Sequence, residues 1–369
     1  MESSECTERA AYLQEQIITY LGNKRHLLDF IGQGVHEVQN RLGRRRLRCL
    51  DAFSGSGVVS RYLKQFSACL YTNDLEDYAR VLNTCYLANR EEVQAAALPR
   101  RYEELMQRMP EEMHPGLLAR YYAPQDDAHI QLGERVFYTH RNAVYLDTAR
   151  RLIGEMPESV QPFFLAPLLY EASVHTNTSG VFKGFYKNAE GVGQFGGRGR
   201  HALQRICADI QLQLPVFSRY DTEYHVLQGD AAVLPTILPE LDLAYVDPPY
   251  NQHPYGSNYF MLNLLLRNEL PEGCSEVSGI PDDWNRSSYN RRCEAAESLR
   301  ALLAGLPARF ILVSYNSEGF ISPQKMKALL APLGRVTEMV TDYATFRGCR
   351  NLRSRSLSVQ EYLYLLEKA

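Results

Sequence analysis

The chain has 369 residues, 45% of them hydrophobic, and a formal net charge of −3 at pH 7. This composition excludes an intrinsically disordered chain, and the balanced charge argues against a protein that coats nucleic acid by electrostatics alone. The polar N-terminal stretch and the short apolar runs predict neither a signal peptide nor a membrane span, so we expect a cytoplasmic protein without a membrane partner.

Eight cysteines are spread along the chain without a CxxC pair or a neighbouring histidine at zinc-ligand spacing. Isolated cysteines of this kind are typical of reduced thiols rather than of a disulfide framework or a zinc site. We therefore expect no metal ion, and we expect Cys49 and Cys69 to lie in strands.

The first predicted elements are two helices, over residues 8–20 and, after a break at Gly22, over about 24–39. The stretch TYLGNKRHLL forms a short exposed junction between them. From residue 48 the pattern changes to strand, helix, strand and helix, in the segments CLDAF, VVSRYLKQF, ACLYTND and LEDYARVLNTCYLAN. This alternation predicts an open, mostly parallel sheet with flanking helices.

The middle of the chain, about residues 90–220, lacks this alternation. It contains charge-rich helical stretches, breaks near Pro110 and Pro115, and a glycine-rich, aromatic and basic segment over 177–200. We interpret it as an insertion that interrupts the α/β domain. Alternation then returns with the strands YHVLQGD, LDLAYVD and RFILVSY and the helix QKMKALLAPLG, and two strands, VTEMVTDYATF and LSVQEYLYLLEK, are predicted at the end.

A glycine loop, DAFSGSG, follows the first predicted strand. Gly55 and Gly57 have no Cβ and can take positive φ, so a ligand can approach the backbone closely, although an ordinary tight turn would use the same residues. The next strand ends about twenty residues further on in Asp74, whose carboxylate can accept hydrogen bonds from both ribose hydroxyls of a nucleoside cofactor. Ser60 stands where a dinucleotide fingerprint continues with glycine, which favours a bulky cofactor without a pyrophosphate.

The segment Asp247-Pro248-Pro249-Tyr250 comes directly after an apolar strand. Proline has a fixed φ and no N–H, and it holds the preceding residue extended, so the Asp247 carboxylate and the Pro248 carbonyl become two adjacent acceptors without a competing donor. Such a pair can grip an amino group and direct the nitrogen lone pair at an electrophilic methyl group. Tyr250 offers a flat face on which a base can stack.

In this order, DAFSGSG, TNDL and DPPY, with YLGNKRHLL upstream, resemble the motifs of amino-methyltransferases that modify adenine N6 in DNA, specifically the D12 or Dam-like (alpha) class. The resemblance covers about residues 15–90 and 225–365. It implies an α/β fold, a seven-stranded, mostly parallel Rossmann-like methyltransferase sheet with helices on both faces and one antiparallel strand. It also implies a catalytic domain made of residues 1–90 and 223–369, interrupted by a largely helical target-recognition domain over 91–222.

The resemblance further implies a set of cofactor contacts. The N-terminal motif would contact the methionine part of S-adenosylmethionine, the glycine loop would pack beside the cofactor, Asp74 would hold the ribose and Asp230 would receive the adenine amino group. Many relatives have Gly at the position of Asn23, which puts that one contact in doubt. The complete set is Tyr20, Gly22, Asn23, Lys24, Asp51, Phe53, Ser54, Gly55, Gly57, Asp74 and Asp230, and the target base would be bound by Asp247, Pro248, Pro249 and Tyr250.

Two further groups of residues are candidates for DNA contact. The segment after DPPY looks like part of a subgroup of restriction-modification methyltransferases and would line the mouth of the base pocket, although His253 could also be a surface histidine. The insertion alternates basic and aromatic residues, which suit phosphates and bases, although they could equally belong to a glycine-rich surface loop. The candidates are His253, Tyr255, Asn258 and Tyr259 in the first group and Lys183, Tyr186 and Lys187 in the second.

Basic runs occur at residues 44–48 and 198–205, and in an arginine-rich connection that contains Arg347, Arg350, Arg353 and Arg355. They suit phosphate contact or simple solvation.

We therefore expect a site-specific methyltransferase that moves a methyl group from S-adenosylmethionine to N6 of an adenine flipped out of double-stranded DNA. It would work as a monomer on DNA, in a restriction-modification system with a partner endonuclease. Alternatives are methylation of cytosine N4, of an RNA base or of a protein glutamine, an NAD-dependent oxidoreductase, and a catalytically silent DNA-binding protein. Motif order and the insertion favour DNA adenine over the other amino groups. An oxidoreductase would leave the DPPY segment unexplained.

Overall fold

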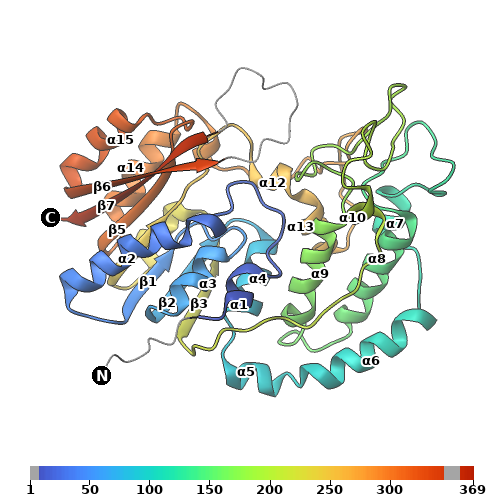
Figure 1. Ribbon diagram of the computed structural model, residues 1–369, viewed down its shortest axis with the longest axis horizontal. Helices are drawn as coiled ribbons and strands as arrows, with labels where there is room; N and C mark the ends of the chain where they lie inside the picture. The colour runs from blue at the N-terminus through green and yellow to red at the C-terminus, as the bar shows by residue number, and fades with distance from the viewer. Residues whose placement is uncertain (1–7, 345–357) are drawn as a thin grey trace.

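The computed structural model describes residues 8–344 and 358–369 of the chain. Figure 1 shows a sheet with flanking helices, at the left, joined to a mainly helical part at the right. No helix among the described residues is both long enough and apolar enough to cross a membrane. The six cysteines in the described part of the chain are free thiols, and Cys49 and Cys69 lie in strands as predicted.

The sheet has seven strands in the order β3-β2-β1-β4-β5-β7-β6. β7 is antiparallel to both of its neighbours, and the other pairs are parallel, so the prediction of a mostly parallel sheet with one antiparallel strand is confirmed. The order reverses between β1 and β4, and ligands of such sheets bind at the carboxyl ends of the strands beside that reversal. The strands are β1 (Leu47–Asp51), β2 (Ser67–Asp74), β3 (Glu223–Gln228), β4 (Leu241–Val246), β5 (Ala308–Asn316), β6 (Gly334–Ala344) and β7 (Ser358–Lys368).

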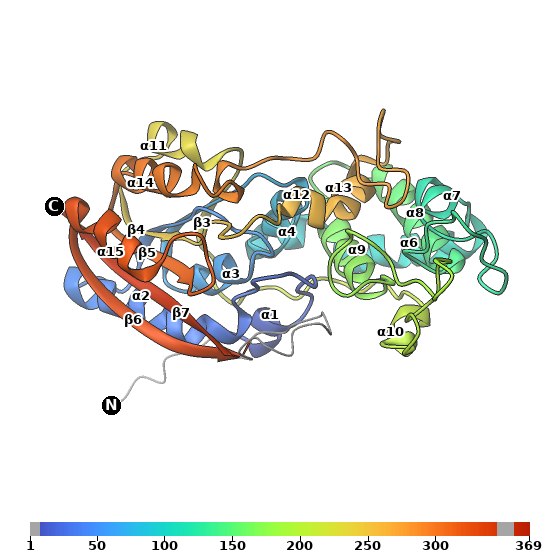
Figure 2. The same cartoon turned by 90° about the horizontal axis from the view of Figure 1, so that it is seen from above.

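Helices cover both faces of the sheet, which explains why its central strands are apolar nearly throughout. One core joins the sheet to α2 and α3, and a second joins its other face to α11, α14 and α15. Figure 2 shows α11 and α14 on one side of the strands and α2 on the other. These helices are α2 (Leu28–Leu42), α3 (Val58–Lys64), α11 (Leu234–Ile237), α14 (Ala295–Gly305) and α15 (Pro323–Leu330).

The N-terminal helices are shorter than predicted. α1 (Ala10–Gln14) ends early, and α2 begins only at Leu28, after a single 3-10 turn (Arg25–Leu27). The buried Arg61 guanidinium donates to the carbonyls of Tyr12, Glu15 and Gln16 and lies over the ring of Tyr86. These bonds hold the chain extended after Gln14, because carbonyls that bind Arg61 are not free to continue a helix.

The helical part has its own elements between β2 and β3. They are α4 (Asp77–Tyr86), α5 (Arg90–Ala95), α6 (Leu98–Glu111), α7 (Leu117–Tyr121), α8 (His140–Gly154), α9 (Pro162–Val174) and α10 (Leu203–Cys207). Two more helices, α12 (Tyr255–Asn258) and α13 (Phe260–Arg267), follow β4 and pack there as well.

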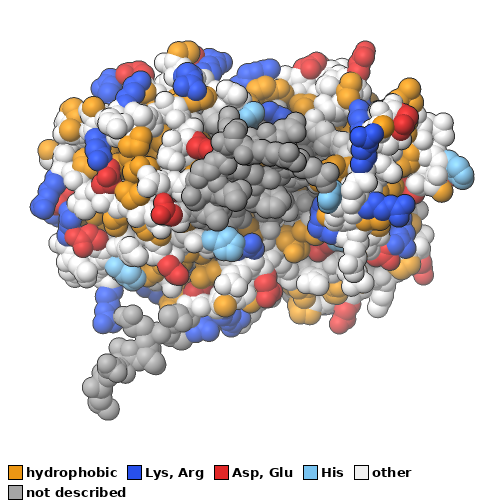
Figure 3. Space-filling model, turned by 45° about the horizontal axis from the view of Figure 1, so that its top comes forward, with side chains coloured by type: hydrophobic (Ala, Val, Ile, Leu, Met, Phe, Trp, Pro, Cys, Tyr) orange, Lys and Arg blue, Asp and Glu red, His pale blue; other side chains and the backbone are white. Residues whose placement is uncertain are grey.

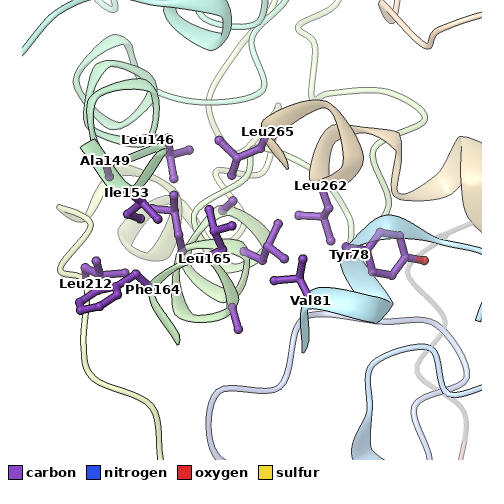
Figure 4. Packing of buried hydrophobic residues seen from close by; sticks show 14 of the residues in the cluster. Tyr78, Val81, Leu146, Ala149, Ile153, Phe164, Leu165, Leu212, Leu262 and Leu265 are labelled. Carbon is purple, nitrogen blue, oxygen red and sulfur yellow. The ribbon is translucent and has the colours of Figure 1, made fainter. Parts of the chain in front are cut away.

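The largest hydrophobic core of the described residues crosses both predicted domain boundaries. In Figure 4, side chains of α8 and α9 pack against Leu262 and Leu265 of α13 and against Val81 of α4. Residues 91–222 therefore share one core with α4, which precedes them in the chain, and with α13, which follows them. The helical part is fused to the catalytic segments rather than attached through free linkers.

Candidate active site

A pocket with about 880 Å³ of empty space lies at the carboxyl ends of β1, β2 and β4. We call it the cofactor pocket. The loops after these three strands line it together with residues 20–24, which come from the N-terminal junction. Of the predicted cofactor contacts, the structure brings together Tyr20, Gly22, Asn23, Lys24, Phe53, Ser54, Gly55, Asp74 and Asp230.

The glycine loop after β1 depends on two glycines in the left-handed region. Gly55 has φ +49°, and a Cβ there would lie 2.9 Å from the ring of Tyr20. Gly57 has φ +78°, and a Cβ there would lie 3.2 Å from Oδ1 of Asn83. Both the backbone conformation and the space therefore favour glycine, as the loop sequence predicted. Gly57 does not line the pocket and serves the turn into α3.

Asp74 closes the loop from the end of β2. Its Oδ2 accepts a hydrogen bond from the N–H of Gly55 (2.7 Å), and its Oδ1 accepts one from the N–H of Glu76 (3.0 Å). Burial raises the pKa of Asp74, while these backbone donors oppose the rise. The carboxylate is thus held rigidly at the wall of the pocket with lone pairs left for a ligand.

A second carboxyl group, Glu76, lines the pocket and was not predicted from the sequence. Its Oε2 accepts hydrogen bonds from Nδ2 of Asn263 (2.6 Å) and of Asn285 (3.2 Å). Burial raises the pKa of Glu76 to about 7, with a further rise from Asp74. Its position two residues after the strand-end Asp74 is the signal that could have identified it.

Asp51 lies behind the loop and does not line the cofactor pocket. Ser60 donates to its Oδ2 at 2.6 Å, and Oδ1 has no hydrogen-bond partner among the described residues. Burial raises the pKa of Asp51 to about 7, and the Ser60 hydrogen bond opposes this. Asp51 is therefore placed to support the loop from below rather than to contact a cofactor.

Asp230 lies on the exposed rim of the pocket. Its Oδ1 accepts from the N–H of Ala232 and so caps the 3-10 turn Ala231–Val233. Nearby, Phe53 meets the ring of Tyr289 edge to face, with centroids 5.0 Å apart. The segment that carries Tyr289, with Asn285, Ser287 and Asn290, also lines the pocket and carried no sequence signal that we recognised.

Three tyrosines brace the N-terminal loop. The ring of Tyr20 stacks on those of Tyr255 (4.9 Å) and Tyr259 (4.6 Å). The hydroxyl of Tyr259 accepts from the N–H of Leu21, and that of Tyr255 donates to its carbonyl. Tyr259 is fully buried and Asn258 nearly so, with its amide on the backbone of His253. For Tyr259, which does not line the cleft described below, the structure thus indicates a bracing role in place of the predicted DNA contact, whereas Asn258 lines that cleft and its DNA contact stays a prediction.

Lys24 and Asp247 form an ion pair in the lining of the pocket, with Nζ 3.0 Å from Oδ2, and the lysine is buried while the carboxylate is partly buried. Burial raises the pKa of Asp247 to about 6, and the Lys24 ammonium opposes this rise, so Asp247 is mainly a carboxylate at neutral pH. The sequence predicted acceptors without a competing donor after β4. The structure corrects this, because the Lys24 ammonium lies 3.0 Å from Oδ2 and a hydrogen bond from Ser314 also lowers the pKa of the carboxyl group.

A much larger cleft meets the cofactor pocket at residues 20–24 and Tyr255. It is open to solvent, spans about 3440 Å³ of empty space, and is lined from the sheet part by Tyr250 and His253 and from the helical part by Tyr186 and Lys187. Lys183 is not in its lining but lies near His253, whose pKa is lowered by burial and by Lys183. Members of both groups of predicted DNA contacts therefore line one cleft.

The basic runs have different surroundings. Arg198 and Arg205 line the cleft, whereas Arg44 pairs with Asp242 at 3.0 Å on the sheet part. Arg347, Arg350, Arg353 and Arg355 lie outside the described residues. On the face shown in Figure 3, Lys and Arg side chains occur on both parts of the molecule, with acidic side chains between them.

One group with metal-ligand chemistry lies away from the pocket, on β2 and β3. It consists of Cys69, Glu223 and His225. The His225 ring nitrogen is 3.0 Å from a Glu223 oxygen, and burial raises the pKa of the Cys69 thiol while the nearby Arg48 opposes it. Because Arg48 already supplies positive charge there, we assign this group no metal.

Comparison with known proteins identifies the family. The family model described as D12 class N6 adenine-specific DNA methyltransferase matches residues 20–329. The type II methyltransferase M.CviAII of Paramecium bursaria Chlorella virus 1 is 30% identical over 95% of this chain and 98% of its own length. The type II methyltransferase M.NlaIII of Neisseria lactamica is 28% identical over 95% of this chain and 99% of its own length. The chain therefore belongs to the D12 class of N6 adenine-specific DNA methyltransferases.

Proposed function

We propose that this adenine-N6 methyltransferase binds S-adenosylmethionine in the cofactor pocket and receives the target adenine, flipped out of double-stranded DNA, in the adjoining cleft beside Tyr250. The observation that carries the proposal is the Lys24–Asp247 pair, which stands where the pocket and the cleft meet.

The residues around the pocket fit this cofactor. Asp74 offers a rigid carboxylate for two ribose hydroxyls, Phe53 and Tyr289 offer apolar ring surface, and Asp230 stands at the rim for an amino group. Tyr20 and Lys24 enclose the end nearest Asp247. When bound, the cofactor supplies an electrophilic methyl group, and the chain itself binds and orients.

Asp247 would hold the target amino group. One of its oxygens is taken by Lys24, and the other can accept an amino proton together with the carbonyl of Pro248. Accepting both protons withdraws the nitrogen lone pair from the ring and directs it out of the ring plane, which lowers the barrier to attack. The ring of Tyr250 would stack on the base, and Pro248 and Pro249 keep the turn rigid.

The base has to leave the duplex, because its amino group is inaccessible within the stack. The helical part, including Lys183, Tyr186 and Lys187, would contact the DNA and select the site, with His253 facing it from the sheet part. Because its relatives are named type II methyltransferases, we propose that this chain acts as a monomer in the cytoplasm, in a restriction-modification system with a partner endonuclease.

The test pairs two substitutions. Asp247→Ala should reduce the methyl-transfer rate by at least about a thousandfold, since it removes a group aimed at the transition state, and should leave cofactor affinity nearly unchanged. Asp74→Ala should weaken the cofactor far more than DNA. The readouts are N6-methyladenine in plasmid DNA from a methylation-deficient host, by nucleoside mass spectrometry and single-molecule sequencing, and cofactor binding by calorimetry. Asp29→Ala, on the exposed surface of α2, is the matched control. Equal loss of transfer and cofactor binding in Asp247→Ala would disprove the assigned role.

A further inference from the structure

A buried carboxylate on β7, Glu361, has no role in the site described so far. It is 5% exposed, and its Oε1 accepts a hydrogen bond from Nδ2 of Asn316 (2.8 Å). Its Oε2 is buried and has no hydrogen-bond partner among the described residues. A buried carboxylate oxygen without a donor is costly, so a compensating interaction or a function is expected.

The sheet places Glu361 beside the reacting end of the site. β7 pairs with β5 so that Glu361 lies opposite Asn316, the last residue of β5, next to the strand end from which Asp247 follows. The negative charge of Glu361 contributes to the raised pKa of Lys24, of Asp247 and of Tyr250, which means that it acts on all three. It also lines the cleft together with Tyr250.

Charges in this region do not balance. Among the described residues, the carboxylates of Asp247 and Glu361 lie near one ammonium, that of Lys24. The other polar or titratable groups near the pair are Tyr245, Tyr250, Ser314, Glu318 and the more distant Asp51. Within the described part of the chain, a net negative charge thus remains where the cofactor pocket and the cleft adjoin.

The reaction gives this charge a use. As the bond between N6 and the methyl carbon forms and the carbon–sulfur bond breaks, positive charge moves from sulfur to N6, and N6 then releases one proton to water. A fixed negative charge close to N6 favours the charged transition state over the neutral amine.

We propose that Glu361, which lines the cleft beside the Lys24–Asp247 pair, is a positioning residue for methyl transfer, and that its charge stabilises the positive charge that develops on the target nitrogen. This rests on the proposed role of Asp247. This role predicts that loss of the Glu361 charge slows the chemical step without weakening the binding of DNA or of the cofactor.

Glu361→Gln is the main test, because it keeps the side-chain size and an acceptor for Asn316 and removes only the charge. We expect the single-turnover rate constant to fall about tenfold or more, with the affinities for DNA and cofactor nearly unchanged. The acidic limb of the pH–rate profile should move to lower pH, because Glu361 raises the pKa of Asp247. Glu361→Asp keeps the charge, so its rate should lie nearer the wild-type rate and its acidic limb should stay in place.

Glu367→Gln is the matched control. It lies on the same strand and pairs with Arg41, away from the pocket, so its rate and pH profile should equal those of the wild type. A wild-type rate and profile in Glu361→Gln overturns the proposal, as does a rate in Glu361→Asp as low as that of Glu361→Gln. If Asp247→Ala is inactive while Glu361→Gln is normal, only the role of Glu361 is wrong. If Asp247→Ala is active, the proposed function fails first.

Discussion

The sheet part and the helical part position their polar side chains by different means. Asp74 and Asp247 lie at or just after the ends of parallel strands, so the hydrogen-bonded ladder fixes where they stand. Lys187 and Arg198 are carried by residues 175–202, which form no helix or strand. That segment is held instead from below, by the fully buried side chain of Asn177.

Asn177 connects three pieces of the helical part. Its Nδ2 donates to the carbonyls of Val136 (2.9 Å) and Gln194 (3.3 Å), and its Oδ1 accepts from the N–H of Gly196 (2.9 Å). Changes at the strand ends should therefore alter cofactor binding and chemistry, whereas changes in the helical part should alter DNA binding. Four predictions test this division.

The largest effect is expected for Lys24→Met. It leaves the buried Asp247 carboxylate unpaired, which should lower the transfer rate at pH 7 by at least about a hundredfold. Lys24 opposes the rise of the Asp247 pKa to about 6, so without it the pKa rises further and less carboxylate is present at pH 7. The rate should therefore recover partly as the pH is raised towards 9. A loss that is independent of pH would show that Lys24 acts on the cofactor alone.

Asn177→Ala tests the same division between the two parts by a change in the helical part. Loss of two buried hydrogen bonds and one partly buried hydrogen bond should lower the free energy of unfolding by about 2 to 4 kcal/mol and weaken DNA binding, with cofactor affinity unchanged. Chemical denaturation, fluorescence anisotropy with duplex DNA and calorimetry with the cofactor measure the three quantities. Asn188→Ala, in a more exposed turn of the same segment, is the control. Weaker cofactor binding in Asn177→Ala would break the division between the two parts.

Lys187→Ala should have a smaller effect. If its ammonium contacts a phosphate, DNA affinity should fall similarly for all sequences, and the slope of log affinity against log salt should decrease by about 1. Lys325→Ala, an exposed lysine on α15 outside the cleft lining, should change neither quantity. An unchanged salt slope in Lys187→Ala would place this side chain off the DNA.

The smallest effect is expected for Asp51→Asn, and it concerns stability. Burial raises the folded-state pKa of Asp51 to about 7, so the folded protein keeps a proton there that the unfolded chain releases near pH 4. Wild-type stability should accordingly fall as the pH rises from about 4 to 7, with the full penalty present above 7. Asn keeps an acceptor for Ser60 and carries no charge, so Tm at pH 8 should rise by about 2 to 4 °C.

This gain should shrink as the pH is lowered towards 4. Asp29→Asn, on the exposed face of α2, should show no such dependence. An equal gain at all pH values would mean that packing, not charge, limits stability at this position.

From the sequence alone, the catalytic half of the protein could be largely predicted. Apolar runs that are followed by a glycine loop, or that lead into Asp74 or Asp247, identify the strands. Because the carboxyl ends of neighbouring parallel strands lie at the same edge of the sheet, these runs also predict where the polar side chains come together. That reasoning located most of the residues that line the cofactor pocket and the turn after β4. It failed where a local pattern was overridden by a distant side chain, as when Arg61 ended the first helix early.

Only the tertiary structure decided the rest. The pairing of Lys24 with Asp247, the bracing role of Tyr259 and the position of Glu361 opposite Asn316 all join segments far apart in the chain. The fusion of residues 91–222 with α4 and α13 into one core was equally hidden. Periodicity reports which face of an element is apolar, but it does not report which other element will cover that face.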